Sequence, residues 1–237
     1  MNNDSPERGG KQPGDAILEC VEVKKSFTVK RKEIPVLKNI NLSISRNEVV
    51  LITGKSGAGK STLLGLLAGL EPPTSGSVIF EGQPLEKLPN ETLASLRRRK
   101  VGIIFQNFNL LPSWTAFENV ESALLHAGMS KNDRRTRVEP LLNKLGLGDR
   151  LNNLPVELSV GQQQRVAVAR TLVNEPALIL ADEPTGDVDP ETGEEIVKML
   201  LAAVSERGAT LVIATHGGSF RDIAGKKFHL EEGVLAI

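Results

Sequence analysis

An apolar, β-branched run, Glu48–Thr53 (EVVLIT), leads directly into a glycine-rich segment, Gly54–Ser61 (GKSGAGKS), and then into a leucine-rich stretch of helical pattern, Lys60–Leu70. A run that is apolar throughout predicts a strand buried on both faces. The glycine-rich segment, called the phosphate loop below, matches G-x-x-x-x-G-K-[ST], a pattern that is meaningful when a strand precedes it and a helix follows. Strands and helices alternate beyond it, so we expect an α/β fold with a mainly parallel core sheet.

The phosphate loop has the chemistry of an anion site. Its glycines let backbone N–H groups turn inward around a phosphate, and the following helix directs its positive end at the same anion. We expect Lys60 to reach the β- and γ-phosphates of a nucleotide, Ser61 to coordinate Mg²⁺, and Thr62 to contact the α-phosphate. The plainer alternative is a structural glycine-rich turn.

A second buried strand is predicted at Leu178–Ala181, and it ends in two carboxylates, Asp182 and Glu183. In an enzyme with a phosphate loop, an Asp at such a strand end holds Mg²⁺, directly or through water. Glu183 would point into the site and accept a proton from an attacking water. Strands often end in acidic turns, and it is the phosphate loop that favours the catalytic interpretation.

A capping box, S-x-x-Q, stands at Ser159 and Gln162, before another stretch of helical pattern. The Ser159 hydroxyl, the Gly161 N–H and the helix N-terminus also suit a second anion site. Because one nucleotide already has its phosphate loop, this second site suggests that two chains share each nucleotide. An ordinary helix cap is the alternative, and it explains Ser159 but not the flanking glycine and glutamines.

The remaining pattern predicts further strands and helices. Strands are expected at 16–23, 39–44, 78–80, 101–105 and 210–214 and near residues 228 and 234, and helices at 90–99, 115–126, 133–145, 162–174 and 191–205. Asn90 is the expected N-cap of its helix. The strands before the phosphate loop have no helices between them, so we expect a separate antiparallel layer. Residues 107–160 should form an inserted helical subdomain.

Composition and charge exclude several classes of protein. Lys and Arg number 29, as do Asp and Glu, and this neutral balance disfavours binding to nucleic acid. The single cysteine, Cys20, excludes a disulfide framework and predicts a buried thiol. Residues 63–70, the longest apolar stretch, are too few to span a membrane. Residues 1–15 lack the apolar core of a signal peptide and are expected to form a disordered leader.

Three motifs in order along the chain, the phosphate loop, LSVGQQQR (Leu158–Arg165) and LILADEP (Leu178–Pro184), resemble those of ATP-binding cassette (ABC) ATPases. The resemblance runs from residue 17 to 237. It implies one ABC ATPase domain over residues 16–237, with a mainly parallel core sheet, an antiparallel β layer and the helical subdomain inserted. ATP and Mg²⁺ are the cofactors it implies.

The resemblance also implies roles for further residues. Gln106, in FQNFNLLP, would sense Mg²⁺ and relay closure to a partner; Asp187–Asp189 would form the loop after the catalytic Glu; His216 would contact the γ-phosphate; and Phe27 would stack on adenine. The expected catalytic residues are Glu183, His216, Lys60 and Gln106, and the expected metal ligands are Ser61, Gln106 and Asp182. The expected ATP-binding residues are Phe27, Gly54, Lys55, Ser56, Gly57, Ala58, Gly59, Lys60, Ser61, Thr62, Ser159, Gly161 and Gln162.

Longer stretches, such as RRRKVGIIFQNFNLLPSWTAFENV, look like the ATPase subunits of lipoprotein-releasing and macrolide-exporting systems. This likeness implies a homodimer that closes head to tail on ATP, with Ser159 and Gly161 of one copy facing the phosphate loop of the other. It also implies a separate membrane permease, docked on Asn107–Phe117, and a place at the cytoplasmic face of the cell membrane. Trp114 is the aromatic residue of that segment most expected to be exposed.

Three positions depart from the family pattern: Val160 stands where the family usually has Gly, His216 is followed by Gly, and the adenine-stacking position is Phe27 rather than Tyr.

Three other functions compete with the transport function. They are a nucleotide-dependent regulator of an envelope or cell-division complex, a soluble ABC-type ATPase, and a small-molecule kinase. The last explains the phosphate loop but not LSVGQQQR. The basic run Arg97–Lys100 suits either a solvated helix end or contact with lipid headgroups or a permease loop.

Overall fold

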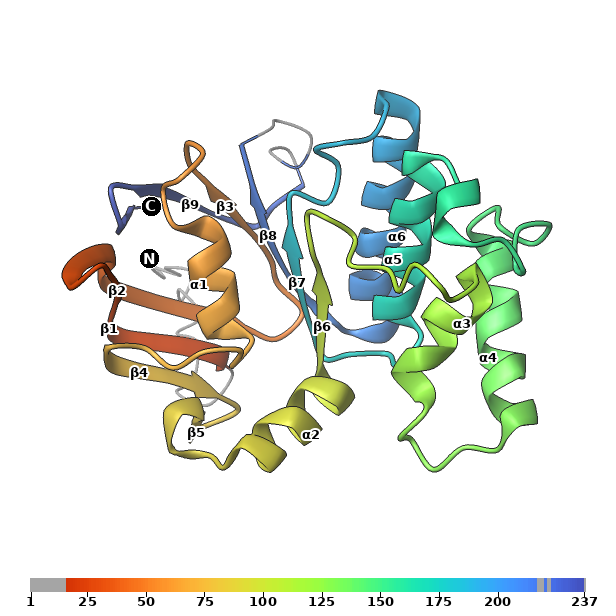
Figure 1. The fold of residues 1–237 in the computed structure, drawn as a ribbon. Coiled ribbons are helices and arrows are strands. Elements are labelled where there is room, and N and C mark those ends of the chain that lie inside the picture. The colour runs from red at the N-terminus through yellow and green to blue at the C-terminus, as the bar shows by residue number, and fades with distance from the viewer. Residues whose placement is uncertain (1–15, 217–219, 221–222, 237) are drawn as a thin grey trace, which may run out of the picture.

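The computed structural model describes residues 16–216, 220 and 223–236. The expected leader, residues 1–15, and the glycines that follow His216 lie outside the described residues. Two sheets form the frame of the molecule, a four-stranded antiparallel sheet and a six-stranded sheet (Figure 1). No helix in the described part of the chain has the length and apolar character needed to cross a bilayer.

The antiparallel sheet has the order β2-β1-β4-β5. Its strands are β1 (Ala16–Val29), β2 (Lys32–Ser45), β4 (Ser75–Phe80) and β5 (Gln83–Pro84). The hairpin of β1 and β2 is longer than the sequence predicts, because pairing continues as far as Val29 and Lys32. The outer half of this hairpin is mostly exposed. Its residues therefore lack the apolar alternation by which a strand is recognised.

The six-stranded sheet confirms the expected α/β class with a mainly parallel core. Its order is β10-β9-β3-β8-β7-β6, and every neighbouring pair is parallel except β10 and β9. The strands are β3 (Val49–Thr53), β6 (Val101–Ile104), β7 (Leu178–Asp182), β8 (Thr210–Thr215), β9 (Lys226–Glu231) and β10 (Val234–Ala236). The strand β3, which precedes the phosphate loop, lies between β8 and β9 and is central, as its apolar run predicts.

Successive residues of the central strands serve two different cores. In β3, Val50 and Ile52 pack with α1 (Lys60–Leu67) and the antiparallel sheet. Leu51 points the other way, toward α5 (Val160–Leu172) and α6 (Pro190–Arg207). The same alternation holds in β7 and β8. Figure 1 shows α1 on one side of the sheet and α5 and α6 on the other. The sheet is therefore buried on both faces.

A third core lies among helices alone. It joins α3 (Ala116–Glu121) and α4 (Lys131–Lys144) to one side of α5, through Val120, Leu142 and Val166 among others. Residues 107–160 hold helices and no strand, and the short 3₁₀ turns η2 (Ser122–Leu124) and η3 (Pro155–Glu157) complete the region. On the other side, η1 (Leu85–Lys87) leads to α2 (Asn90–Lys100), which precedes β6.

Several predicted helix ends differ from the structure by a few residues, and two of them have a clear local cause. Asn90 was expected to cap α2, but the capping position is Pro89 and Asn90 is the first helical residue. Proline fixes φ near the helical value and so suits the start of a helix without a side-chain cap. The helix predicted over Lys60–Leu70 ends at Leu67, because Gly69 takes a left-handed φ of 61°. The bonds from Gly69 N to Leu66 O and from Leu70 N to Gly65 O complete a Schellman turn.

Candidate functional site

The phosphate loop and the carboxyl ends of β6, β7 and β8 open onto one cleft of about 520 Å³. Ligands of open parallel sheets bind at this edge, where loops follow the strand ends. The cleft brings together residues from five separate stretches of sequence. They are Val36, Lys55, Ser56, Gly57, Gly59, Lys60, Ser61, Thr62, Gln106, Asp182, Glu183 and His216.

Two glycines of the phosphate loop are required by their surroundings. A Cβ on Gly54 would lie 2.3 Å from the carbonyl oxygen of Leu230 in β9. Gly59 has a φ of 103°, and a Cβ there would approach Leu37 and Val36 to about 3 Å. Neither place accepts a side chain, so the loop can fold only with glycine at both positions.

Lys60 extends back under the loop that precedes it. Its Nζ donates hydrogen bonds to the carbonyl oxygens of Gly54 at 2.8 Å and Lys55 at 3.2 Å. The same nitrogen lies 3.6 Å from Oε1 of Glu183, and both side chains are 7% exposed. The cleft therefore contains a buried cation and a buried anion within ion-pair distance.

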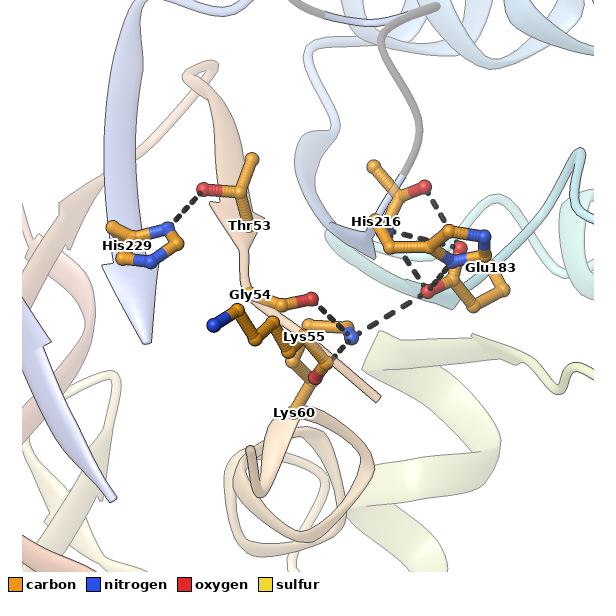
Figure 2. A network of polar contacts seen from close by, with 8 residues as sticks. Thr53, Gly54, Lys55, Lys60, Glu183, His216 and His229 are labelled. Carbon is orange, nitrogen blue, oxygen red and sulfur yellow. Dashed lines mark hydrogen bonds and ion pairs between the residues drawn. The ribbon is translucent and has the colours of Figure 1, made fainter. Parts of the chain in front are cut away.

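Glu183 is held by a network of hydrogen bonds from the end of β8 (Figure 2). The Thr215 hydroxyl donates to Oε2 at 2.8 Å, the His216 backbone N–H donates to Oε1 at 3.0 Å, and the His216 ring nitrogen Nδ1 lies 2.8 Å from Oε1. Burial alone would raise the pKa of Glu183. The bonds from His216 and Thr215, with the charge of Lys60, outweigh it and hold the pKa below the ordinary value. Glu183 is therefore an ionised acceptor.

The pKa of Asp182 is shifted in the opposite direction, above its ordinary value. Burial raises its pKa, a hydrogen bond from Ser61 opposes that effect, and the neighbouring charge of Glu183 adds to it. Its Oδ1 is buried, with no hydrogen-bond partner in the described part of the chain. Hard cations such as Mg²⁺ take carboxylate and hydroxyl oxygens, with waters and substrate phosphates in the other positions. Asp182 and Ser61 therefore fit Mg²⁺, with Gln106 on the same cleft.

Phe27 lies apart from the lining of the cleft. It is on β1, opposite Ile34 in the hairpin, and 37% exposed. The Lys25 ammonium lies 5.0 Å from the centre of its ring, a cation–π distance. Gly54 and Ala58 belong to the phosphate loop, but do not line the cleft.

The predicted capping box at the start of α5 is confirmed. Gln162 N–H donates to Ser159 Oγ at 3.3 Å, and Ser159 N–H donates to Gln162 Oε1 at 3.0 Å. Ser159 and Val160 are exposed, and none of Ser159, Gly161 and Gln162 lines the cleft of the same chain. A ligand bound at this exposed helix start would therefore lie outside the chain's own cleft.

The segment Asn107–Phe117 is fixed by two buried or half-buried polar side chains. Asn119 bonds to the backbone of Leu111, Trp114 and Thr115. Arg170 donates to the carbonyls of Phe108 and Asn109, each at 2.6 Å. The expectation that Trp114 is the exposed residue is wrong: it is half-buried, and Leu111 is 42% exposed.

Sequence reasoning missed Thr215 and Gln164. Thr215 is a hydroxyl residue directly before a histidine at the end of an apolar strand, and its significance appears only once β8 lies beside β7. Gln164 is 1% exposed and donates from Nε2 to the carbonyl of Pro184 at 2.7 Å. It thereby joins α5 to the turn that follows Glu183.

Comparison with known proteins finds a matching family model and several similar proteins. The family model described as "ABC transporter" matches residues 37–186. The lipoprotein-releasing system ATP-binding protein LolD of Geobacter metallireducens is 43% identical over 92% of this chain and 97% of its own. The macrolide export ATP-binding/permease protein MacB of Syntrophobacter fumaroxidans is 42% identical. The matched region takes in 92% of this chain and 31% of that longer protein.

Among solved structures, the dimeric ATP-binding cassette MJ0796 bound to ADP and Pi has a TM-score of 0.88 and 39% identity, with 93% of this chain and 97% of that one covered. The family match takes in the phosphate loop, the capping box and the strand that carries Asp182 and Glu183. The chain belongs to the ABC transporter ATP-binding family.

Proposed function

We propose that the chain is an ATP-hydrolysing subunit that dimerises on ATP and drives a separate membrane permease of the lipoprotein-release or macrolide-export type. The observation that carries the proposal is the cleft in which Lys60, Asp182, Glu183 and His216 converge from different elements. It is supported by the 43% identity to a LolD protein over almost the whole length of both chains. The functional unit is a single domain, residues 16–237, with a helical subdomain over about 107–160.

In the proposed reaction, a water attacks the γ-phosphorus, its proton passes to Glu183, and the bond to the β–γ bridging oxygen breaks to release ADP and phosphate. The phosphate loop and Lys60 hold the phosphates, Thr62 adds a contact, and Phe27 stacks on adenine. Ser61, Asp182 and Gln106 hold Mg²⁺, which when bound neutralises charge on the phosphates. His216 moves from Glu183 toward the γ-phosphate.

We infer further that each nucleotide lies between two copies of the chain. The start of α5 is exposed and capped, and its residues do not line the chain's own cleft, as the sharing of ATP between head-to-tail copies requires. A matched solved structure, the cassette MJ0796, is described as dimeric. Val160, exposed at 48%, occupies the face that would meet the other copy.

The proposed permease contact is Asn107–Phe117, which would place the chain at the cytoplasmic face of the cell membrane. Leu111 is its exposed apolar anchor, on a backbone that Asn119 and Arg170 hold in place. Anchors on a fixed backbone lose little entropy when a partner binds.

The proposal is tested with Glu183→Gln. The variant should bind ATP, form a dimer measurable by light scattering, and lose hydrolysis. A variant that stays monomeric and hydrolyses ATP at the normal rate would contradict the mechanism. Affinity purification of the tagged variant from solubilised membranes with ATP then identifies the partner. A permease supports the transport function, a cell-envelope regulator without transport supports the regulatory alternative, and only soluble partners support the cytosolic alternative.

A further inference from the structure

The two oxygens of Glu183 have different partners. Oε1 accepts from His216 and lies near the Lys60 ammonium. Oε2 has one short contact, the 2.8 Å bond from the Thr215 hydroxyl, and a longer one of 3.3 Å from His216 N. The orientation of the carboxylate is thus set jointly by a ring, a backbone N–H and a hydroxyl.

These partners differ in how freely they can move. The His216 side chain is 67% exposed and can turn into the cleft without disturbing the core. Thr215 is 3% exposed and is the last residue of β8, where it pairs with Thr53 of β3. A β-branched residue in a paired central strand has a fixed χ1, so its hydroxyl stays where the backbone places it.

Glu183 itself needs such an anchor. Its backbone has a φ of 47°, outside the strand conformation, and its N–H is bonded to the carbonyl of Ala214 in β8. The backbone is thus fixed, but three side-chain torsions remain, and an unanchored glutamate keeps most of that rotamer freedom. Once the His216 ring leaves, the Thr215 hydroxyl stays as a hydrogen-bond donor to Oε2, while the Lys60 ammonium stays beside Oε1.

We propose that Thr215 is a positioning residue: its hydroxyl keeps the Glu183 carboxylate directed into the cleft when the His216 ring turns toward the γ-phosphate. The inference rests on the proposed role of Glu183 as the acceptor of the water proton. It assigns Thr215 no contact with ATP, water or metal. Its loss should therefore lower the rate of the chemical step and leave ATP binding intact.

The test is Thr215→Val, which removes the hydroxyl and keeps the shape of the side chain. We expect kcat for ATP hydrolysis to fall by about tenfold, since a hydrogen bond to a charged group is worth at least that factor. KM for ATP should stay unchanged, because the phosphate loop is untouched. Thr215→Ser, which retains the hydroxyl, should restore most of the rate.

The matched control is Thr210→Val, at the other end of the same strand. Thr210 is also fully buried and its hydroxyl accepts from Asn47 N–H at 3.0 Å, far along β8 from Glu183. This variant should lose stability in thermal unfolding but retain kcat. If Thr215→Val does not fold, Thr215→Ala removes the same hydroxyl with less bulk, and the same comparison with Thr215→Ser applies.

An unchanged kcat in Thr215→Val would overturn the inference. So would a serine variant as slow as the valine variant, or an equal loss of kcat in Thr210→Val. Glu183→Gln distinguishes a failure of the proposed catalytic role of Glu183 from a failure of the positioning role of Thr215. If Glu183→Gln still hydrolyses ATP, the proposed function of Glu183 fails. If it is inactive while Thr215→Val is normal, only the positioning role fails.

Discussion

Lys60 Nζ lies 3.6 Å from Glu183 Oε1, across the cleft between the phosphate loop and the end of β7. The two side chains are equally buried, and each has other partners: two loop carbonyls for Lys60, and Thr215 and His216 for Glu183. A buried pair with its remaining donors and acceptors satisfied avoids most of the cost of desolvation. The charges of the cleft are thus arranged before any substrate arrives.

Replacement of Lys60 by Met, which roughly preserves the length of the side chain, should weaken nucleotide binding strongly. The loss removes the cation that faces the phosphates, and hydrogen bonds to charged groups are worth about 1.5–3 kcal/mol, or roughly 10- to 100-fold in affinity. Titration with a fluorescent ATP analogue measures it. An affinity equal to that of the unchanged protein would show that Lys60 does not contact the phosphates.

Cys20 should be inert in the folded protein. Burial raises the pKa of its thiol to about 12, and the reactive thiolate is therefore nearly absent at neutral pH. Ellman's reagent should release no thionitrobenzoate from the native chain and one equivalent per chain in guanidinium chloride, since the sequence has one cysteine. Rapid reaction of the native protein would show that β1 opens far more easily than its burial implies.

Ionised Glu81 should stabilise the folded protein at pH values above the pKa of this side chain. Burial raises that pKa, but the hydrogen bonds and the charges of Lys100 and Arg46 together outweigh burial and lower it. A lowered folded-state pKa contributes stability that is complete above the unfolded-state pKa and is lost as the pH falls through the folded-state pKa. Glu81→Gln should cost up to about 1 kcal/mol at pH 7. The difference in urea unfolding should vanish in acid; a difference that persists there would contradict the ionic origin.

Leu111→Glu should weaken permease binding by about tenfold or more without changing Tm, because an exposed anchor contributes to an interface and not to the core. Leu70→Glu is the matched control, since Leu70 is 49% exposed and lies just after α1, outside the proposed docking segment. Binding to the purified permease in detergent is the measurement. Equal effects of the two substitutions would place the contact elsewhere.

The sequence predicts most of this site because its residues follow apolar strands. Asp182 ends β7, Glu183 follows it and His216 follows β8, and the carboxyl ends of parallel strands share one edge. The importance of Thr215 could not be predicted in this way, because it depends on the register that puts Ala214 opposite Asp182. The fixed backbone around Trp114 could not be predicted either, because Asn119 bonds to its carbonyl oxygen and no periodic pattern links the two residues.

The strand that carries the phosphate loop has both of its neighbours far away in sequence. Within the described part of the chain, strand β3 pairs with β8 at residues 211–215 and with β9 at residues 226–229, and the back of the loop at Gly54 rests on the carbonyl of Leu230. As the ribosome releases the chain, the whole nucleotide motif emerges early and must wait without sheet partners until nearly all of the domain has been made. A chain that ends before β8 therefore lacks both of the strands that pair with β3 beside the phosphate loop.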